Sequence, residues 1–198
     1  MQRGLQPRSR TSGRVALLAL DLITDFDFPD GPAVRQALSR HAGSIRRLLD
    51  GARAQRVPII YANDNLGSWR SDAPALIAHC TRPALAGAAL VKLLCPADAD
   101  AIILKPRHSA FFGTALEALL DDRSISTLLL VGISAESCVW MTACDAHTRG
   151  FGLVIPADTM AGASTRALRA TLTGLKDVLG ARVPARARSL QFRRGKLK

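Results

Sequence analysis

Three residues that lie far apart in this 198-residue chain have the side chains needed for nucleophilic catalysis. Cys138 is expected in the first turns of a helix that follows a buried strand. There the helix dipole and a nearby cation would lower the pKa of the thiol and give a thiolate at neutral pH. Asp21 and Lys105 each follow a strand, so the aspartate could take the thiol proton and the lysine could hold both groups. Spacing alone leaves a second explanation open, in which Cys138 is a small apolar residue of the core.

The other three cysteines show no pattern of chemical use. Cys80 and Cys95 have no charged setting, and both are interpreted as packing residues. Cys144 would lie on a nearly opposite face of the helix that carries Cys138, which makes it a poor resolving partner. The absence of a CxxC pair argues against a disulfide framework and against a zinc site built from cysteines.

Short apolar runs that alternate with helical patterns must position these residues. The predicted strands are 15–20, 57–61, 101–104, 127–131 and 152–155, with a weak sixth near 182–183. The predicted helices are 30–55, 75–80, 114–120, 136–149 and 164–179. Repeated strand and helix predict an α/β fold of three layers, with a mainly parallel sheet of five or six strands and helices on both faces.

In such a sheet the ligand lies beyond the carboxyl ends of the strands. The residues directly after the predicted strands are therefore the candidates for a site. They are Asp21, then Asn63 to Asn65, then Lys105, and then the segment from Gly132 to Cys138. The three residues with catalytic side chains all belong to this set.

The net charge of +11 is concentrated at the two ends of the chain. Residues 1–14 carry four arginines and residues 181–198 carry seven lysines and arginines, with no acidic residue in either segment. We therefore expect a domain over 15–183 between flexible basic tails, 1–14 and 184–198. The tails could bind nucleic acid through phosphate contacts. Phe192 alone would provide an aromatic stacking surface there, which favours solvated ends over a nucleic-acid site.

The apolar segments of the chain predict no membrane contact. No run approaches the roughly 20 apolar residues that a membrane-spanning helix needs. Residues 1–14 lack the apolar centre of a signal peptide. The expected location is the cytoplasm.

Three segments resemble the isochorismatase-like cysteine hydrolases, a family that includes nicotinamidases and ureido- or carbamoyl-amidohydrolases. ALDLITDFDFP (19–29) resembles the first strand of that family with its aspartate, and LKPRHSAFFGT (104–114) resembles its lysine segment. VGISAESCVWMTACDAHTRGF (131–151) is similar to the nucleophile segment and is the most specific of the three matches. The resemblance extends from Val15 to about Val183.

The resemblance implies a role for each of the three residues. Asp21 would be the base, Lys105 its charge partner and Cys138 the nucleophile, which decides between the two explanations of this cysteine. It also implies a cis peptide bond between Ile133 and Ser134, and an oxyanion hole formed by the backbone N–H groups of Ser134 and Cys138. A homodimer or homotetramer is the implied assembly.

The chain departs from the nicotinamidase branch where that branch binds a metal. The branch uses an aspartate and two histidines after the second strand, whereas residues 63–70 contain no histidine. His79 and His108 are the nearest histidines, and we interpret both as hydrogen-bonding partners at the pocket edge. We predict that the protein has no catalytic metal and no cofactor.

The predicted substrate pocket combines aromatic and polar side chains. Asn65 and Arg70 are its candidate anchors for a carboxylate or ureido group. The wall is expected to consist of Phe26, Asn65, Trp69, Arg70, His108 and Phe111.

The predicted reaction is hydrolysis of the C–N bond of a small amide, carbamoyl or ureido substrate through a thioester. One alternative is vinyl-ether hydrolysis as by an isochorismatase, which dispenses with a cysteine. Another is a non-catalytic scaffold or nucleic-acid-binding protein that uses the basic tails. A serine hydrolase is excluded, because His147, the only histidine after Ser134, would lie on the helix that the serine opens.

Overall fold

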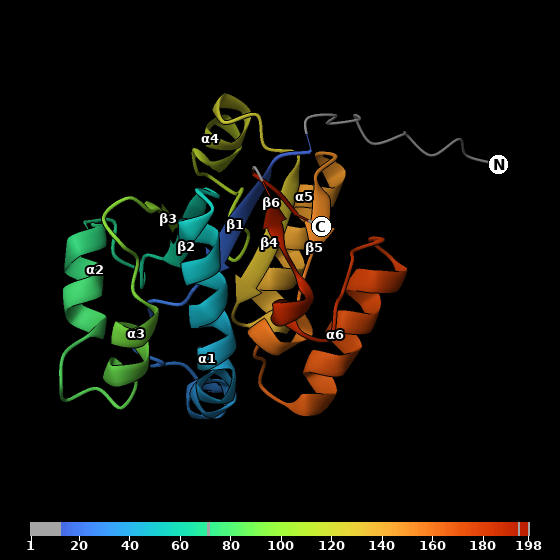
Figure 1. Cartoon of the computed structure of the whole chain (residues 1–198). Helices are drawn as coiled ribbons and strands as arrows, with labels where there is room; N and C mark the ends of the chain where they lie inside the picture. Colours follow the sequence, from blue (N-terminus) through green and yellow to red (C-terminus); the bar gives the residue numbers. More distant parts are fainter. Residues whose placement is uncertain (1–12, 71, 194, 198) are drawn as a thin grey trace.

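The computed structural model describes residues 13–70, 72–193 and 195–197 of the chain. It contains a five-stranded sheet in the order β3-β2-β1-β4-β5, and all its strand pairs are parallel (Figure 1). The strands are β1 Val15–Leu20, β2 Ile59–Asp64, β3 Ala101–Lys105, β4 Thr127–Gly132 and β5 Gly152–Val154. The weak sixth strand is wrong, because Arg182 forms only an isolated bridge to Val154.

The central strand β1 is buried on both faces of the sheet. All six of its residues are buried, and they alternate between two hydrophobic cores. Val15, Leu17 and Ala19 pack into one core, whereas the residues between them pack into the other. A run without polar residues is therefore what this position requires, since both sides of the strand are covered.

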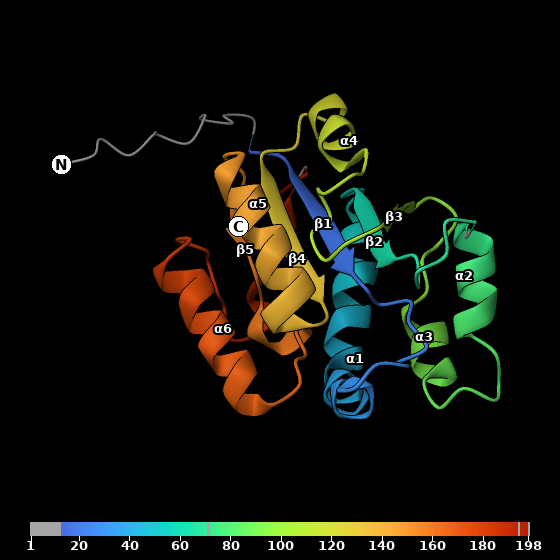
Figure 2. The ribbon, with the colours of Figure 1, turned by 180° about the vertical axis from the view of Figure 1, so that it is seen from behind.

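Helices cover both faces of the sheet and produce the expected three layers (Figures 1 and 2). The core on one side contains residues of α1, Gly31–Ala54, α2, Ala73–Cys80, and α3, Ala88–Leu94. The core on the other side contains residues of α4, Leu116–Asp122, α5, Trp140–Thr148, and α6, Thr165–Asp177. The predicted fold class is confirmed.

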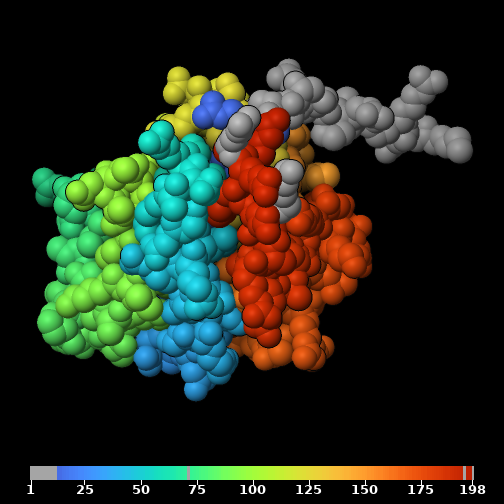
Figure 3. Space-filling model, viewed as in Figure 1, coloured from blue at the N-terminus to red at the C-terminus, as the bar shows by residue number. Residues whose placement is uncertain are grey.

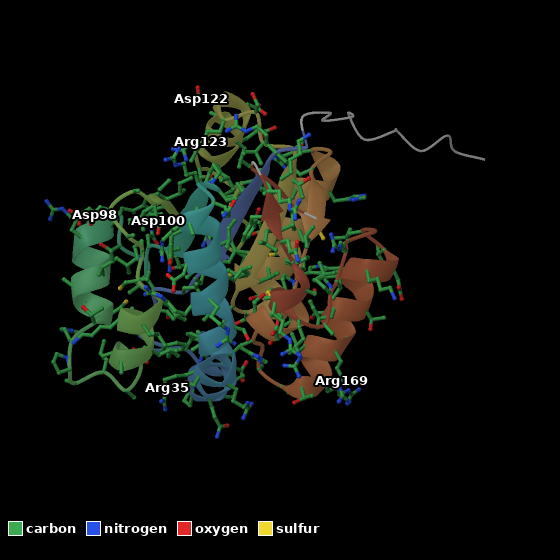
Figure 4. The ribbon with its side chains drawn as sticks, in the orientation of Figure 1. Arg35, Asp98, Asp100, Asp122, Arg123 and Arg169 are labelled. Atoms are coloured by element: carbon green, nitrogen blue, oxygen red, sulfur yellow. The ribbon has the colours of Figure 1, made fainter. Side chains whose placement is uncertain are left out.

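Charged side chains lie on the outer surface of the helical layers. Asp98, Asp122 and Arg169 are exposed and project outward (Figure 4). No helix in the described part of the chain has the length and the apolar composition to cross a membrane.

The predicted helix 136–149 consists of two elements. A π-helical turn, Ala135–Val139, precedes α5 and contains Cys138. Gly132 ends β4 immediately before this turn, with a φ of 125°. A Cβ atom at Gly132 would lie 2.0 Å from the Leu20 carbonyl oxygen, so only glycine fits where β1 and β4 approach each other here.

The C-terminal segment is part of the packed molecule. It contains the 3-10 turn Ala187–Ser189 and two short antiparallel strands, β6 Phe192–Arg193 and β7 Lys196–Leu197. Ala187 and Leu190 are buried, and the segment lies alongside α1 (Figure 3).

The prediction of a loose basic tail over 184–198 is therefore wrong for its described residues. The few apolar side chains of this segment are spaced to reach the core beside α1, while Arg186, Arg188, Arg193 and Lys196 are exposed. The average composition concealed this pattern. The predicted tail 1–14 lies almost wholly outside the described residues.

Candidate active site

Asp21, Lys105 and Cys138 lie side by side at the carboxyl ends of the strands. Lys105 Nζ is 2.9 Å from Asp21 Oδ2 and 3.5 Å from Cys138 Sγ. The lysine thus contacts both the acid and the sulfur. Lys105 thus joins an acid that lies far before it in the sequence to a cysteine that lies well after it.

The parallel register of the sheet brings about this meeting. Lys105 is the last residue of β3 and lies opposite Asp64 of β2, so its side chain passes the end of β2 to reach Asp21. Asp21 directly follows β1 with a φ of 50°, a left-handed conformation that aspartate tolerates better than most residues. The Asp64 N–H donates to Asp21 Oδ1 at 2.7 Å and thereby orients the carboxylate.

Lys105 is completely buried. Lysines are almost never fully buried unless they are paired, and the partner here is Asp21. Burial opposes the lysine charge, but the charge and hydrogen bond of Asp21, together with Cys138 and Asp64, outweigh this effect and raise the pKa of Lys105 above its ordinary value. The ammonium is therefore retained at neutral pH. It provides a fixed positive charge beneath Asp21 and Cys138.

The expected thiolate at Cys138 is wrong for the resting site. Burial and the negative charge of Asp21 together raise the pKa of the Cys138 thiol to about 12, despite the opposing effect of Lys105. Burial is the larger cause of the raised pKa, and the Asp21 carboxylate adds to it. With this pKa, Cys138 is a neutral thiol at neutral pH, so an attack by its sulfur would require a base to take the proton.

His108 is the one predicted pocket-wall residue that reaches the sulfur. Its Nδ1 lies 3.6 Å from Cys138 Sγ. The loop that carries it is fixed to α5, because the Ala110 N–H donates to Thr142 Oγ1 at 3.0 Å and Ser109 donates to Asp145. The nucleophile and this histidine therefore share one rigid support.

A cavity of about 490 Å³ opens beside the sulfur. Asp21, His108, Ser134 and Cys138 line it, and of the predicted wall residues only His108 does so. The peptide bond between Ile133 and Ser134 is cis, in agreement with the expectation. The remaining lining residues are Ile23, Thr24, Asp25, Asp27, Phe28, Asp64, Leu66, Ile133 and Ser137.

Two of the predicted aromatic wall residues belong to the hydrophobic cores. Phe26 is only 6% exposed and packs in the core on the α1 side. Phe111 lies in the opposite core, with its ring 5.8 Å from that of Phe151 and the Arg149 guanidinium above it. The prediction of wall positions for both is wrong, because the chain turns each ring inward away from the cavity.

The other three predicted wall residues lie outside the cavity lining. Trp69 is 85% exposed and Arg70 is also exposed. Asn65 accepts a hydrogen bond from the Gly67 N–H and stabilises a local turn. Their wall positions are wrong because the Asn65 side chain is used in this turn and the chain leaves the cavity after Leu66. Arg70 is therefore not placed to anchor a substrate carboxylate.

Sequence analysis assigned only Phe26 of the segment from Thr24 to Phe28 to the pocket, whereas the other four residues of this segment line the cavity. Asp25 and Asp27 lie in this segment, directly after the strand that ends before Asp21. The positive φ of Phe26, 62°, breaks any extended alternation in this segment, so no sequence period separates Phe28 at the cavity from Phe26 in the core. Phe28 takes the wall position that was predicted for Phe26.

The histidines near the site have partners other than a metal. His79 Nε2 lies 2.8 Å from Asp25 Oδ2, as expected of a pocket-edge partner. Asp64 Oδ1 accepts a hydrogen bond from the Leu66 N–H. Within the described residues, no three histidine, cysteine or acidic side chains are grouped to hold a metal ion.

Comparisons with known proteins agree with this geometry. The family model described as Isochorismatase domain matches residues 15–185. The chain is 34% identical over 168 residues to the uncharacterized isochorismatase family protein YaaI of Bacillus subtilis (strain 168), which covers 85% of this chain and 92% of that protein. It is 31% identical over 172 residues to the N-carbamoylsarcosine amidase of Arthrobacter sp, with 80% of this chain and 64% of that enzyme covered, just under two thirds of its length.

A solved structure shows the same architecture. The crystal structure of an isochorismatase family protein from Desulfovibrio vulgaris subsp. vulgaris str. Hildenborough superposes with a TM-score of 0.69 at 27% identity. The match covers 86% of this chain and 94% of that one. With the family model matching the whole sheet and its helices, the chain belongs to the isochorismatase family of hydrolases.

Proposed function

We propose that this protein is a cysteine hydrolase that cleaves the C–N bond of a small amide, carbamoyl or ureido substrate. The observation that carries the proposal is the contact of Lys105 Nζ with both Asp21 Oδ2 and Cys138 Sγ at the wall of a cavity. An acid, a fixed cation and a sulfur in contact are the groups that acyl transfer through a thioester requires. The cavity has room for a small substrate.

The resting protonation states decide how the reaction begins. Cys138 is a thiol and Asp21 is its neighbouring carboxylate, so Asp21 takes the proton as Sγ attacks the carbonyl carbon. The carbonyl π electrons move to oxygen and give a tetrahedral oxyanion. When the C–N bond breaks, Asp21 returns the proton to the departing nitrogen and a thioester remains. Water then adds with Asp21 as base, and the acid product and the thiol are released.

The oxyanion needs donors close to the sulfur. Ser134 and Cys138 both line the cavity at the start of the π-helical turn, and we assign their backbone N–H groups to this role. One such donor is worth about 3 kcal/mol in the transition state. Lys105 stabilises the anionic partners in turn, since its charge lies between the acid and the sulfur.

The names of relatives support a C–N substrate. N-carbamoylsarcosine amidase is one, and the ureidoacrylate amidohydrolase RutB of Stutzerimonas stutzeri (strain A1501) is another, 30% identical over 157 residues. Vinyl-ether hydrolysis would leave the sulfur without a role. The contact of Cys138 with Lys105 therefore favours the amide reaction.

The test is a panel of primary amides, carbamoyl amino acids and ureido acids assayed for ammonia release. We expect turnover of at least one class, with Cys138→Ala as the inactive blank. Rapid quenching during turnover should give a mass increase on the peptide that contains Cys138, equal to the acyl group. Turnover that persists in Cys138→Ala would contradict the proposal.

A further inference from the structure

We propose that the active-site cavity selects substrates that carry a positive charge, such as short amides with an ammonium group, over substrates that carry a carboxylate. This inference rests on the proposed function, because it concerns the substrate of the same site. It follows from the charges of the cavity wall. The described residues that line the cavity include no lysine or arginine, whereas four of them are aspartates: Asp21, Asp25, Asp27 and Asp64.

Two of these carboxylates have a basic partner. Asp21 forms its ion pair with Lys105, and Asp25 lies 2.8 Å from His79. Burial favours the neutral form of Asp25, but the Asp27 N–H and His79 outweigh it and hold the pKa of Asp25 below its ordinary value. Asp25 is therefore ionised at neutral pH.

The other two carboxylates form no ion pair with the described residues. Asp64 accepts a hydrogen bond from the Leu66 N–H, and the lysine charge nearest to it is already paired with Asp21. Asp27 is exposed at the cavity wall. Even if Lys105, His79 and His108 are all counted as cations, the four aspartates leave an excess of one negative charge.

The remaining wall residues limit the size and polarity of the substrate. Ile23, Phe28 and Leu66 contribute apolar side chains. Arg70 is the only positively charged residue among the predicted anchors for a carboxylate, and it is exposed and outside the cavity lining. A short hydrocarbon chain between the amide and a cationic group would match this wall, whereas a carboxylate would meet repulsion without a counterion.

The first experiment compares three primary amides of similar size on the full chain. They are β-alaninamide, which is a cation, butyramide, which is neutral, and succinamate, which is an anion. We expect kcat/KM to fall by about tenfold at each step from cation to anion, and the differences to shrink at high salt. Equal values for the three amides, or a preference for succinamate, would overturn the inference.

The second experiment measures the charge of the cavity without turnover. The trimethylammonioethyl and sulfonatoethyl methanethiosulfonates differ in charge, and each forms a mixed disulfide with a cysteine thiol as methanesulfinate leaves. The reagent ratio is the rate of labelling by the cationic reagent divided by the rate of labelling by the anionic one. We expect the reagent ratio of Cys138 to exceed that of free mercaptoethanol by about tenfold or more. Peptide mass identifies Cys138, and a Cys144→Ser background removes the partly exposed thiol of α5. A ratio equal to that of mercaptoethanol would overturn the inference.

Variants assign the effect to particular carboxylates. Asp27→Asn and Asp64→Asn should each lower the reagent ratio about threefold to tenfold. Asp30→Asn removes the same charge from an exposed position outside the lining and should leave the ratio unchanged. Equal effects of all three variants would mean that overall charge, and not the cavity wall, sets the ratio, and would overturn the inference.

The two experiments separate the inference from the proposed function. If no amide is turned over but the reagent ratio is high, the hydrolase is wrong while the cavity still selects cations. If neutral and anionic amides are turned over as fast as the cation, the hydrolase stands and the selectivity fails. Repeating the labelling with Mg²⁺ and with EDTA tests a metal ion as the occupant. A preference that Mg²⁺ reverses would overturn the inference.

Discussion

At the scale of single residues, the site depends on a buried lysine that contacts the Asp21 carboxylate and the Cys138 thiol. Lys105 has no exposed surface, so its charge is compatible with folding only because Asp21 compensates it. Because of this ion pair, replacing either partner alone leaves a buried charge without a counterion and lowers the free energy of unfolding. Chemistry and stability are therefore coupled at this position.

Lys105→Met is expected to remove ammonia-releasing activity and to lower the free energy of unfolding by about 3 to 5 kcal/mol, because the buried Asp21 carboxylate loses its counterion. Urea denaturation measures the second effect. The double variant Asp21→Asn with Lys105→Met should regain most of this stability while staying inactive. Full activity in Lys105→Met would exclude the lysine from the reaction.

The protonation of Cys138 gives a prediction about pH. Because burial and Asp21 raise the pKa of this thiol to about 12, its thiolate fraction keeps growing far above pH 9. The rate of alkylation by iodoacetamide should therefore still rise with pH where that of a free thiol, with a pKa of about 8.5, has levelled off. Peptide mass spectrometry at a series of pH values measures the profile.

Asp21→Asn is the matched control for this profile. This substitution removes the negative charge that raises the pKa of Cys138, while the positive charge of Lys105, which lowers that pKa, remains beside the sulfur. The pKa of the thiol should therefore fall. Alkylation at about pH 8 should become faster than in the unmodified protein. A profile that levels off near pH 9 in the unmodified protein would show that the resting thiol is not suppressed.

At the scale of elements, the carboxyl ends of β1 and β4 set the position of the nucleophile. Leu20 and Gly132 are register partners, and the chain turns directly after Gly132 into the π-helical turn. The contact of Gly132 with the Leu20 carbonyl leaves no room for a side chain. The close approach of the two strands therefore fixes where the sulfur lies relative to Asp21.

Gly132→Ala is expected to lower the free energy of unfolding by about 2 to 4 kcal/mol, because the added Cβ would meet the Leu20 carbonyl and the φ of 125° strains any side chain. Denaturant unfolding measures this. Gly180→Ala has a positive φ but nothing within 4 Å of its Cβ, so it should cost only about 1 kcal/mol. Equal losses in the two variants would mean that the strand contact plays no part.

At the scale of the whole molecule, the C-terminal segment closes the core beside α1. The Ala187 N–H donates to Asp158 Oδ1 at 2.6 Å, and Ser44 of α1 donates to Asp158 Oδ2 at 3.1 Å. The buried carboxylate of Asp158 thus joins two segments that lie more than a hundred residues apart. The segment adds to stability although its composition is basic.

A chain that ends at Pro184 is expected to lose about 3 to 5 kcal/mol of unfolding free energy, because Leu190 leaves the core and Asp158 loses a buried donor. Denaturant unfolding of the shortened protein provides the measurement. The exposed pair Arg186→Ala and Arg188→Ala should change stability by no more than about 0.5 kcal/mol each, which separates packing from charge. An unchanged stability after truncation would restore the view of a loose tail.

Local patterns predicted much of the fold and the core of the site. The run VALLAL identified the central strand, because a strand covered on both faces must be apolar at every position. Asp21 and Lys105 could be placed at one edge, because parallel strands share the direction of their carboxyl ends. The residues of the pocket wall were harder to predict from the sequence, since Phe26 and Phe28 differ only in which way the loop turns each ring.

The sequence by itself determined the five strands, every helix except α3, the family, and which side chains end the strands near one another. These properties follow from short-range periodicity and from side-chain chemistry. The tertiary structure alone decided that Cys138 rests as a thiol, that four aspartates and no lysine or arginine are among the described residues of the cavity wall, and that the basic C-terminal segment packs against α1. Burial, charge pairing and long-range packing depend on distances across the fold, which no local pattern contains.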